Sequence, residues 1–459
     1  MSNGAVGTVT ASCVRRAPER HGKSRDTSVS GALRVLGASN PSSNPGAGSK
    51  EIVNCLILNI SKISEVRQFA EGSPCKQTQG PLEYPESVLN FTERSTKHGY
   101  ISDEHTVLTE DGYILTVFHM RSRENCSRQP GRPLILMHGL LMSSDTWLDA
   151  GPGASLAYLL ADACFDLWLG NIRGNCYGRR HATLDPDADH EFWDFSVDEM
   201  GAYDVPAIVD HVLNQTGSDR VDYIGYSQGG GEMLIMCSER PSLCNRVRTF
   251  IAVAPATRLT HSKSWTLRVL FNVLRLTGDF LGWFRFKELF PKGGVGQILL
   301  SHLCQYDVLL EMICRGSLSM VDSEHEGSIK AETLKVVHAN FPSGTSVRTF
   351  VRYGQALRSE GYRKMDYGEE RNLKLYGVAT PPYHNISAVT IPTVIVYGRN
   401  DYIIDRKDVE WLANSLPNVL QIVEVCDPMW NHFDFMYSQH TKAMVFPTVL
   451  KYLTRASDS

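Results

Sequence analysis

One short stretch constrains this 459-residue chain more than any other. Residues 221–231 read Val-Asp-Tyr-Ile-Gly-Tyr-Ser-Gln-Gly-Gly-Gly, and an apolar run follows at 233–236. A β-branched and aromatic run, then Gly-x-Ser-x-Gly, then a helix is the order that a nucleophile elbow requires. Gly225 and Gly229 lack a Cβ, so strand and helix can approach closely there. The pattern predicts that Ser227 lies on a strained turn at a helix N-terminus, which favours negative charge.

Continuous apolar runs recur on both sides of this stretch and alternate with segments of helical spacing. Runs of this kind indicate buried parallel strands, and their alternation with helices predicts an α/β fold: a mostly parallel sheet with helices on both faces. Ser196 and Glu199 form a capping-box pattern at the start of one helical segment. The predicted strands are 133–137, 165–169, 221–226, 249–255, 393–397 and 420–425, and the predicted helices include 154–161, 195–213, 409–413 and 444–453.

An antiparallel hairpin is predicted before the parallel strands. Residues 104–109 and 113–118 alternate in the manner of strands, and Asp111-Gly112 lies between them. Asp-Gly between two such runs is a strong hairpin signal.

The strand pattern divides the chain into three parts. Residues 86–255 and 383–459 form the predicted α/β-hydrolase core. Residues 256–382 contain no clear strand and are too long for a crossover helix, so they predict an inserted helical cap or lid; an ordinary helical subdomain is the alternative. Its apolar residues at 280–290 suit a lipid-like substrate. Residues 1–85, rich in Ser, Gly, Asn, Arg and Pro, predict a disordered tail or a targeting segment.

Composition excludes several classes of protein. Hydrophobic residues make up 42% and charged residues 21% of the chain, and the net charge is −4, so no nucleic-acid partner is expected. No apolar stretch is long enough for a transmembrane helix. Metal-ligand spacings and a Gly-x-Gly-x-x-Gly fingerprint are both missing, so we expect neither a metal nor another cofactor.

Signals for the cellular compartment disagree with one another. Five Asn-x-Ser/Thr sites suit a glycoprotein of the secretory route, but the first residues do not read as a signal peptide. Eleven cysteines leave at least one unpaired within the chain. Cys304 and Cys314 are either two buried thiols or a disulfide. The five glycosylation sites are Asn59, Asn90, Asn125, Asn214 and Asn385.

Three residues at predicted strand ends have the order that a serine hydrolase of this design needs. Ser227 is followed by Asp401, just beyond the strand 393–397, and then by His432, beyond the last strand. We expect Ser227 to be the nucleophile, His432 the base and Asp401 the acid that orients the imidazole. Asp405 is the fallback for the acid. The backbone N–H groups of Gln228 and Leu140 are the predicted oxyanion donors, since Leu140 follows the strand 133–137.

Several motifs, in order, resemble the acid lipase family of α/β-hydrolases, which contains gastric, lysosomal and insect digestive lipases. The resemblance covers roughly residues 87–455. Its motifs are Thr-Glu-Asp-Gly-Tyr-Ile-Leu at 109–115, His-Gly-Leu at 138–140, Asp-Leu-Trp-Leu-Gly-Asn-Ile-Arg-Gly-Asn at 166–175, Phe-Trp-Asp-Phe-Ser at 192–196, Gly-Tyr-Ser-Gln-Gly at 225–229, Phe-Pro-Ser-Gly-Thr-Ser at 341–346 and Asn-His-Phe-Asp-Phe at 431–435.

The resemblance implies hydrolysis of neutral lipid esters under a mobile lid, without a cofactor, in a secreted or lysosomal protein. It also implies a Cys304–Cys314 disulfide. Ser227, Asp401 and His432 fall on the family's triad positions, and Leu140 and Gln228 fall on its oxyanion positions. Tyr226 stands where the family usually has His, Ile172 where it has Ser, and 398–401 read Gly-Arg-Asn-Asp where it has Gly-Gly-x-Asp. These departures bear on substrate preference and pH optimum and leave the triad intact.

Three functions are compatible with these patterns. The first is a monomeric lipase that acts on triacylglycerol or cholesteryl ester at a lipid–water interface. The second is a soluble carboxylesterase for small esters, which uses the same triad. The third is a non-catalytic lipid-binding protein built on a hydrolase fold, against which the intact Ser227, Asp401 and His432 argue.

Overall fold

The computed structural model describes residues 88–122, 126, 131–283, 287–305 and 308–455. The predicted tail at 1–85 therefore lies outside the described residues, as do Asn59 and Asn125. None of the helices in the described ranges combines the length and apolar composition needed to cross a bilayer.

An eight-stranded sheet forms the centre of the described chain, in the order β1-β2-β4-β3-β5-β6-β9-β10. The first two strands are an antiparallel hairpin around Gly112, whose φ of +97° suits glycine, and the hairpin joins β4 in antiparallel fashion. From β4 to β10 all pairs are parallel, so the predicted α/β class is confirmed. The strands are β1 (Tyr100–Leu108), β2 (Ile114–Ser122), β3 (Pro133–Met137), β4 (Asp166–Leu169), β5 (Val221–Tyr226), β6 (Val247–Val253), β9 (Thr393–Tyr397) and β10 (Val419–Glu424).

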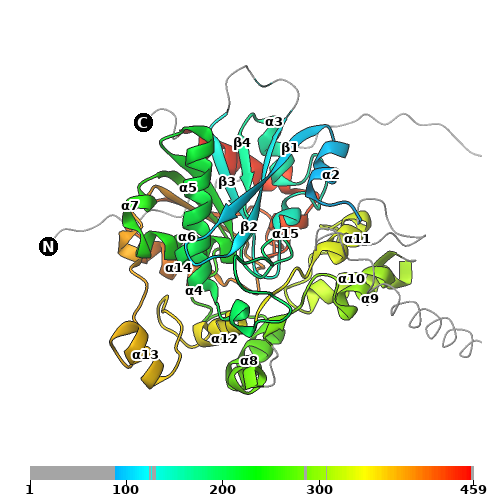
Figure 1. Cartoon of the computed structure of the whole chain (residues 1–459). Coiled ribbons are helices and arrows are strands. Elements are labelled where there is room, and N and C mark those ends of the chain that lie inside the picture. The colour runs from blue at the N-terminus through cyan, green and yellow to red at the C-terminus, as the bar shows by residue number, and fades with distance from the viewer. Residues whose placement is uncertain (1–87, 123–125, 127–130, 284–286, 306–307, 456–459) are drawn as a thin grey trace, which may run out of the picture. The chain divides into compact units, whose positions relative to one another are not determined.

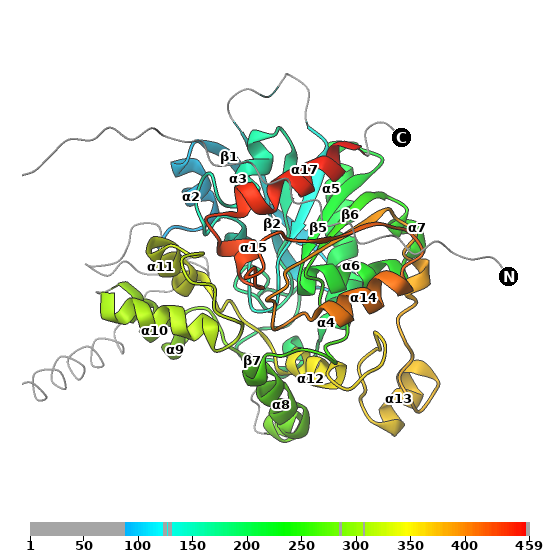
Figure 2. The ribbon, with the colours of Figure 1, turned by 180° about the vertical axis from the view of Figure 1, so that it is seen from behind.

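Helices cover both faces of this sheet. Figure 1 shows α5 in front of the strands, with α6 beside it, and Figure 2 shows α3 and α17 in front when the molecule is turned by 180°. The central strands β3, β4, β5 and β9 are buried along their whole length, as their apolar runs predict. The helices outside the segment 256–382 are α2 (Phe91–Lys97), α3 (Leu156–Asp162), α4 (Val197–Glu199), α5 (Val205–Thr216), α6 (Gln228–Glu239), α7 (Pro241–Cys244), α14 (Arg406–Ser415), α15 (Asp434–Tyr437), α16 (Thr441–Met444) and α17 (Phe446–Arg455).

One predicted helix is interrupted. The segment 195–213 begins with the predicted capping box of Ser196 and Glu199, but a π-helical turn (Met200–Asp204) separates α4 from α5. Gly201 packs there: a Cβ on it would lie 2.5 Å from the Ile235 side chain. The predicted C-terminal helix at 444–453 corresponds to α17, and the short helix α16 precedes it.

The insertion, residues 256–382, lies between β6 and β9 in sequence. Six helices form most of its described residues, and Figure 1 shows α8, α12 and α13 below the sheet. The prediction that it holds no strand is wrong in detail, because β7 (Glu288–Leu289) and β8 (Thr345–Ser346) form a short antiparallel pair. Two-residue strands leave no periodic pattern to detect. The helices are α8 (Trp265–Trp283), α9 (Val295–Gln305), α10 (Val308–Ser319), α11 (Ala331–Asn340), α12 (Val347–Ala356) and α13 (Glu369–Tyr376).

Disulfide bonds occur within the core and within the insertion. Cys304 and Cys314 are bonded and join α9 to α10, as the family resemblance implied. Two further bonds, Cys126–Cys164 and Cys237–Cys244, were not predicted. Cysteine spacing alone does not determine connectivity, so only the structure identifies these pairs.

Candidate active site

Ser227 occupies the sharp turn between β5 and α6. Its φ of +52° and ψ of −114° lie outside the regions that a serine ordinarily adopts. Two glycines make the turn possible: a Cβ on Gly225 would lie 2.6 Å from the Gly229 carbonyl oxygen, and one on Gly229 would lie 2.6 Å from that of Met137. The turn points the Ser227 hydroxyl away from the sheet, and the side chain keeps 6% exposure.

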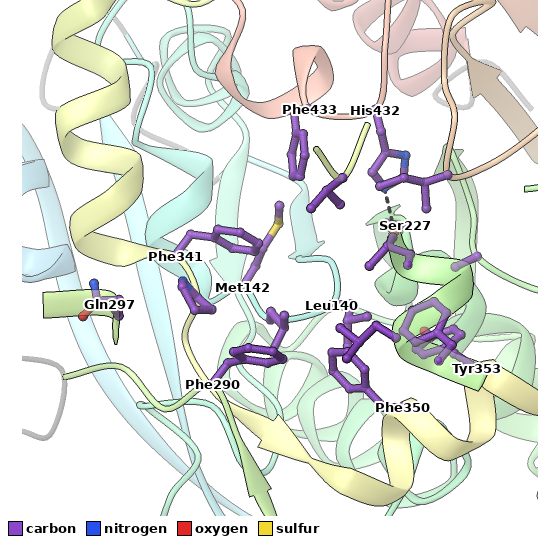
Figure 3. Close-up of a pocket in the computed structure, with 18 of the residues that line it drawn as sticks. Leu140, Met142, Ser227, Phe290, Gln297, Phe341, Phe350, Tyr353, His432 and Phe433 are labelled. Carbon is purple, nitrogen blue, oxygen red and sulfur yellow. Dashed lines mark hydrogen bonds between the residues drawn. The ribbon is translucent and has the colours of Figure 1, made fainter. Parts of the chain in front are cut away.

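His432 links this serine to a carboxylate. Its Nε2 lies 2.9 Å from Ser227 Oγ (Figure 3). Its Nδ1 lies 2.7 Å from Asp401 Oδ2. The carboxylate accepts a hydrogen bond from the Nδ1–H group, so the unprotonated Nε2 is left to accept the serine proton. Burial lowers the pKa of His432, but the charge of Asp401 and its hydrogen bond, together with the charge of Asp322, outweigh burial and raise that pKa above its ordinary value.

Asp401 is fixed by its own loop beyond β9. Its Oδ1 accepts hydrogen bonds from the backbone N–H groups of Ile403 (2.9 Å) and Ile404 (2.7 Å), which leaves Oδ2 facing His432. The fallback, Asp405, is used elsewhere: it caps α14 through the N–H of Lys407 and pairs with Lys263. The two candidate acids therefore have different structural roles.

The loop after β3 lies beside the elbow. A Cβ on Gly139 would lie 3.0 Å from the Tyr226 ring and 3.2 Å from Ser227 Cβ, which is closer than most Cβ contacts, so glycine favours this approach. The next residue is Leu140, and its backbone N–H and that of Gln228 donate to no protein acceptor in the described part of the chain. Both predicted oxyanion donors thus lie on the two segments that meet at Ser227.

Buried amides support the same loop from behind. Asn175 Nδ2 lies 3.1 Å from His138 Nε2, and Asn171 Oδ1 accepts from the N–H of Ser144. Burial lowers the pKa of His138 to about 4, so the imidazole is neutral at ordinary pH. The polar residues at 170–175 therefore position the loop that holds Leu140.

Tyr226 has a defined place next to the nucleophile. Its hydroxyl donates to the His432 carbonyl oxygen at 2.9 Å, and the two rings lie 4.9 Å apart at 35°. The side chain is fully buried. Tyr226 thus fastens the histidine loop to the elbow.

Ser227 and His432 open into an apolar cavity of about 610 Å³ (Figure 3). That volume is within the usual range for a small-molecule site. The core and the insertion both supply its walls, and aliphatic and aromatic side chains dominate. Those from the insertion include Leu267, Leu270, Phe271, Phe290, Pro291, Val295, Leu300, Val321, Phe341, Phe350 and Tyr353, and those from the core include Leu140, Leu141, Met142, Ile403 and Phe433.

One buried carboxylate near the triad was not predicted. Asp322, between α10 and α11, contacts the backbone of the loops that carry Asp401 and His432. No motif surrounds it in the sequence, so only its position in the fold reveals it. No group of three or more His, Cys, Asp or Glu side chains in the described ranges is arranged to hold a metal ion.

Known families match this chain along most of its length. The α/β-hydrolase fold family matches residues 132–438, and a partial α/β-hydrolase lipase region matches residues 91–151. Human gastric triacylglycerol lipase is 35% identical over 404 residues, which cover 87% of this chain and 98% of the relative. Human lysosomal acid lipase/cholesteryl ester hydrolase is 33% identical and covers 84% and 93%, respectively. Lipase 1 of Drosophila melanogaster is 34% identical and covers 81% of both.

A solved structure from Sulfolobus solfataricus shares the fold alone. It aligns with a TM-score of 0.54 at 14% identity and covers 78% of this chain and 95% of its own. The sheet order, the family matches and the relatives agree. The chain therefore belongs to the acid lipase family of α/β-hydrolases, a family of carboxylic ester hydrolases.

Proposed function

We propose that the chain hydrolyses neutral lipid esters, triacylglycerol or cholesteryl ester, through an acyl-enzyme on Ser227. The observation that carries this proposal is the hydrogen-bond series Asp401–His432–Ser227 at the wall of an apolar cavity. A long acyl chain suits such a cavity, because burying apolar surface is favourable by roughly 25 cal/mol per Å².

In the proposed reaction, Ser227 Oγ attacks the ester carbonyl carbon while His432 Nε2 takes the hydroxyl proton. The carbonyl oxygen becomes an oxyanion, which the N–H groups of Leu140 and Gln228 stabilise. His432 then protonates the leaving alcohol, and the acyl group stays on Ser227. Water, deprotonated by His432, attacks this ester and releases the fatty acid. Asp401 stabilises the imidazolium in both halves of the reaction.

We further propose that the insertion binds the lipid–water interface. Along α8, Trp265 (68% exposed), Val269, Val273, Leu276 (71% exposed) and Phe280 follow one another at spacings of three or four residues, which places them on one helix face. The opposite face supplies Leu267, Leu270 and Phe271 to the cavity. A helix that is apolar on both faces is suited to contact with a lipid surface outside and an acyl chain inside. We propose that the enzyme works there as a monomer.

A secretory or lysosomal address is part of the proposal. The disulfides Cys126–Cys164, Cys237–Cys244 and Cys304–Cys314 favour an oxidising compartment, and the named relatives include gastric and lysosomal lipases. Asn214 and Asn385 are exposed and suit glycosylation, whereas the Asn90 side chain caps α2.

The test compares hydrolysis of emulsified long-chain triacylglycerol, cholesteryl ester and a soluble short-chain p-nitrophenyl ester. Ser227→Ala should lower every rate by about 10⁶-fold, whereas Ser218→Ala, in the loop after α5, should leave all three unchanged. Equal rates in wild type and Ser227→Ala would exclude the nucleophile assignment. A preference for the short ester without activation at an interface would instead favour a soluble carboxylesterase. A wild type without activity on any ester would favour a lipid-binding protein.

A further inference from the structure

A short segment of the insertion lies against both loops that complete the triad. It comprises residues 321–323, after α10, and Val321 also lines the cavity. Asp322 is only 4% exposed. A buried carboxylate is costly unless hydrogen bonds satisfy it, so its partners define what it does.

Each carboxylate oxygen of Asp322 serves a different loop. Oδ1 accepts from the N–H of Tyr402 at 2.9 Å, next to the acid Asp401. Oδ2 accepts from the N–H of His432 at 2.7 Å and from that of Phe433 at 3.4 Å. One side chain therefore joins the backbone of the acid loop to the backbone of the base loop.

The neighbours of Asp322 repeat this connection. The Ser323 hydroxyl donates to the Asn400 carbonyl oxygen on the acid loop. The Asn431 side chain, on the base loop, donates to the Ser323 carbonyl oxygen at 2.7 Å. The Ser264 hydroxyl at the start of α8 donates to the Val321 carbonyl oxygen. The insertion is thus bonded to both loops next to the reacting groups.

Charge adds a second effect. The charged groups that act on Asp322 are Asp401 and His432, and Asp322 in turn favours the protonated imidazole. Burial, followed by the charge of Asp401, raises the pKa of Asp322, whereas the charge of His432 acts to lower it. Tyr226, which also lies near, donates its hydroxyl proton to the His432 carbonyl oxygen, and the carboxylate of Asp434 is bound by Ser328 and His325.

From this geometry we propose that Asp322 is a positioning residue for the triad: it aligns Asp401 with His432 and stabilises the imidazolium formed during the reaction. The insertion thereby contributes to the chemistry as well as to the cavity. This inference rests on the proposed ester hydrolysis. Alignment of this kind has large kinetic effects, because misplacement by about 1 Å can cost 100-fold in rate.

The experiment measures kcat, KM and the pH dependence of kcat/KM for the short-chain ester with Asp322→Asn. Asparagine keeps the size and one oxygen but removes the charge and places an NH₂ group against a backbone donor. We expect kcat to fall by about 10- to 100-fold with KM within twofold. Loss of the negative charge lowers the pKa of His432, and the base works only when neutral. The acid limb of the profile should therefore move to lower pH.

A purely structural role would not move that limb. The matched control is Asp427→Asn, which removes a carboxylate that also accepts a backbone N–H, from Met429, in the segment leading to His432. It should leave the limb in place. Asp322→Glu keeps the negative charge, but the longer side chain places the carboxylate oxygens differently. We therefore expect the acid limb of the kcat/KM profile to stay as in the wild type while kcat falls. It also serves as the test if the Asn variant fails to fold.

An unchanged kcat and acid limb in folded Asp322→Asn, or a limb shifted equally in Asp427→Asn, would overturn the inference. If only Asp322→Glu folds, a wild-type kcat or a displaced acid limb in that variant would overturn the inference. Ser227→Ala separates this failure from a failure of the proposed function: if Ser227→Ala retains activity, the hydrolase assignment itself is wrong. If Ser227→Ala is inactive while Asp322→Asn behaves as wild type, only the role of Asp322 is lost.

Discussion

The core and the insertion differ in how many large apolar side chains they expose, and most of those exposed in the described residues belong to the insertion. In the core, polar groups such as Ser227, Asp401, His432 and Asn171 are buried and bound to one another or to the backbone. The insertion instead exposes large apolar side chains, among them Leu276 and Met312. With the proposed function, this difference corresponds to a division of labour in which buried hydrogen bonds fix the chemistry and the insertion binds the lipid. Asp322 is the point where the two regions meet.

Apart from loss of the nucleophile itself, the largest effect should come from the buried acid of the core. Asp401→Asn removes the charge that holds the His432 tautomer, so kcat should fall by about 10⁴-fold, and the acid limb of kcat/KM should move to lower pH because the pKa of His432 falls. Steady-state kinetics across pH measure both. Asp405→Asn is the control. Asn caps a helix about as well as Asp, so α14 keeps its N-cap and kcat should stay within twofold; similar losses in both variants would contradict the assignment of Asp401.

A second core variant disturbs geometry without removing a functional group. In Gly229→Ala the new Cβ meets the carbonyl oxygens of Met137 (2.6 Å) and His138 (2.8 Å), so the elbow and the oxyanion loop must separate. We expect kcat to fall by about 100- to 1000-fold, comparable with the loss of one oxyanion donor. Gly316→Ala in α10 of the insertion has open space around it and should change no kinetic constant. Full activity of Gly229→Ala would contradict the claim that the elbow and the loop after β3 must approach closely at this turn.

In the insertion, substitution of a side chain that lines the cavity should change substrate preference and leave the chemical step unaffected. Phe271 on α8 contacts Phe350 and Tyr353 and lines the cavity. Phe271→Ala should lower kcat/KM for a long-chain ester by about 10-fold, with less than a twofold change for a short ester. Parallel assays on the two substrates give the ratio. Equal losses on both would show that α8 supports the triad generally and does not select the acyl chain.

The smallest effect should come from the exposed face of α8. Leu276→Glu places a charge where we propose contact with lipid, so the rate on emulsified triacylglycerol should fall severalfold while the rate on a soluble short ester stays the same. Binding of the variant to lipid droplets, measured by co-flotation, should weaken in parallel. Leu373→Glu, on an exposed position of α13, is the control. Equal changes in both variants would argue against a specific role for the α8 face.

The sequence predicted most of the core because periodic patterns report burial directly. β3 and β9 match their predicted bounds, and the Ser196–Glu199 capping box is present. His432 lies within hydrogen-bond reach of both Ser227 and Asp401 because each of the three follows a strand of one parallel sheet. The π-helical turn before α5 was missed, since it keeps the apolar spacing of a continuous helix.

The insertion was less predictable for physical reasons. Its role in the site depends on contacts between segments far apart in sequence, and no local pattern records these. Asp322 is a single carboxylate about 80 positions before Asp401, and its meaning comes entirely from the backbone groups that it meets. The sequence also left the role of Tyr226 open, which its hydrogen bond to the His432 carbonyl oxygen now defines. Likewise, the exposed apolar residues of α8 can be recognised as one surface only once the structure shows which side of the helix faces outward.

One measurement tests the division of labour most directly. Purified enzyme is treated with p-nitrophenyl alkylphosphonates that carry either a long or a short alkyl chain, the rate of inactivation is followed, and the adduct is located by peptide mass spectrometry. Both reagents should phosphonylate Ser227 alone, and the long-chain reagent should react about 10-fold faster because only it fills the cavity. An adduct on another residue, or faster reaction of the short-chain reagent, would contradict the account.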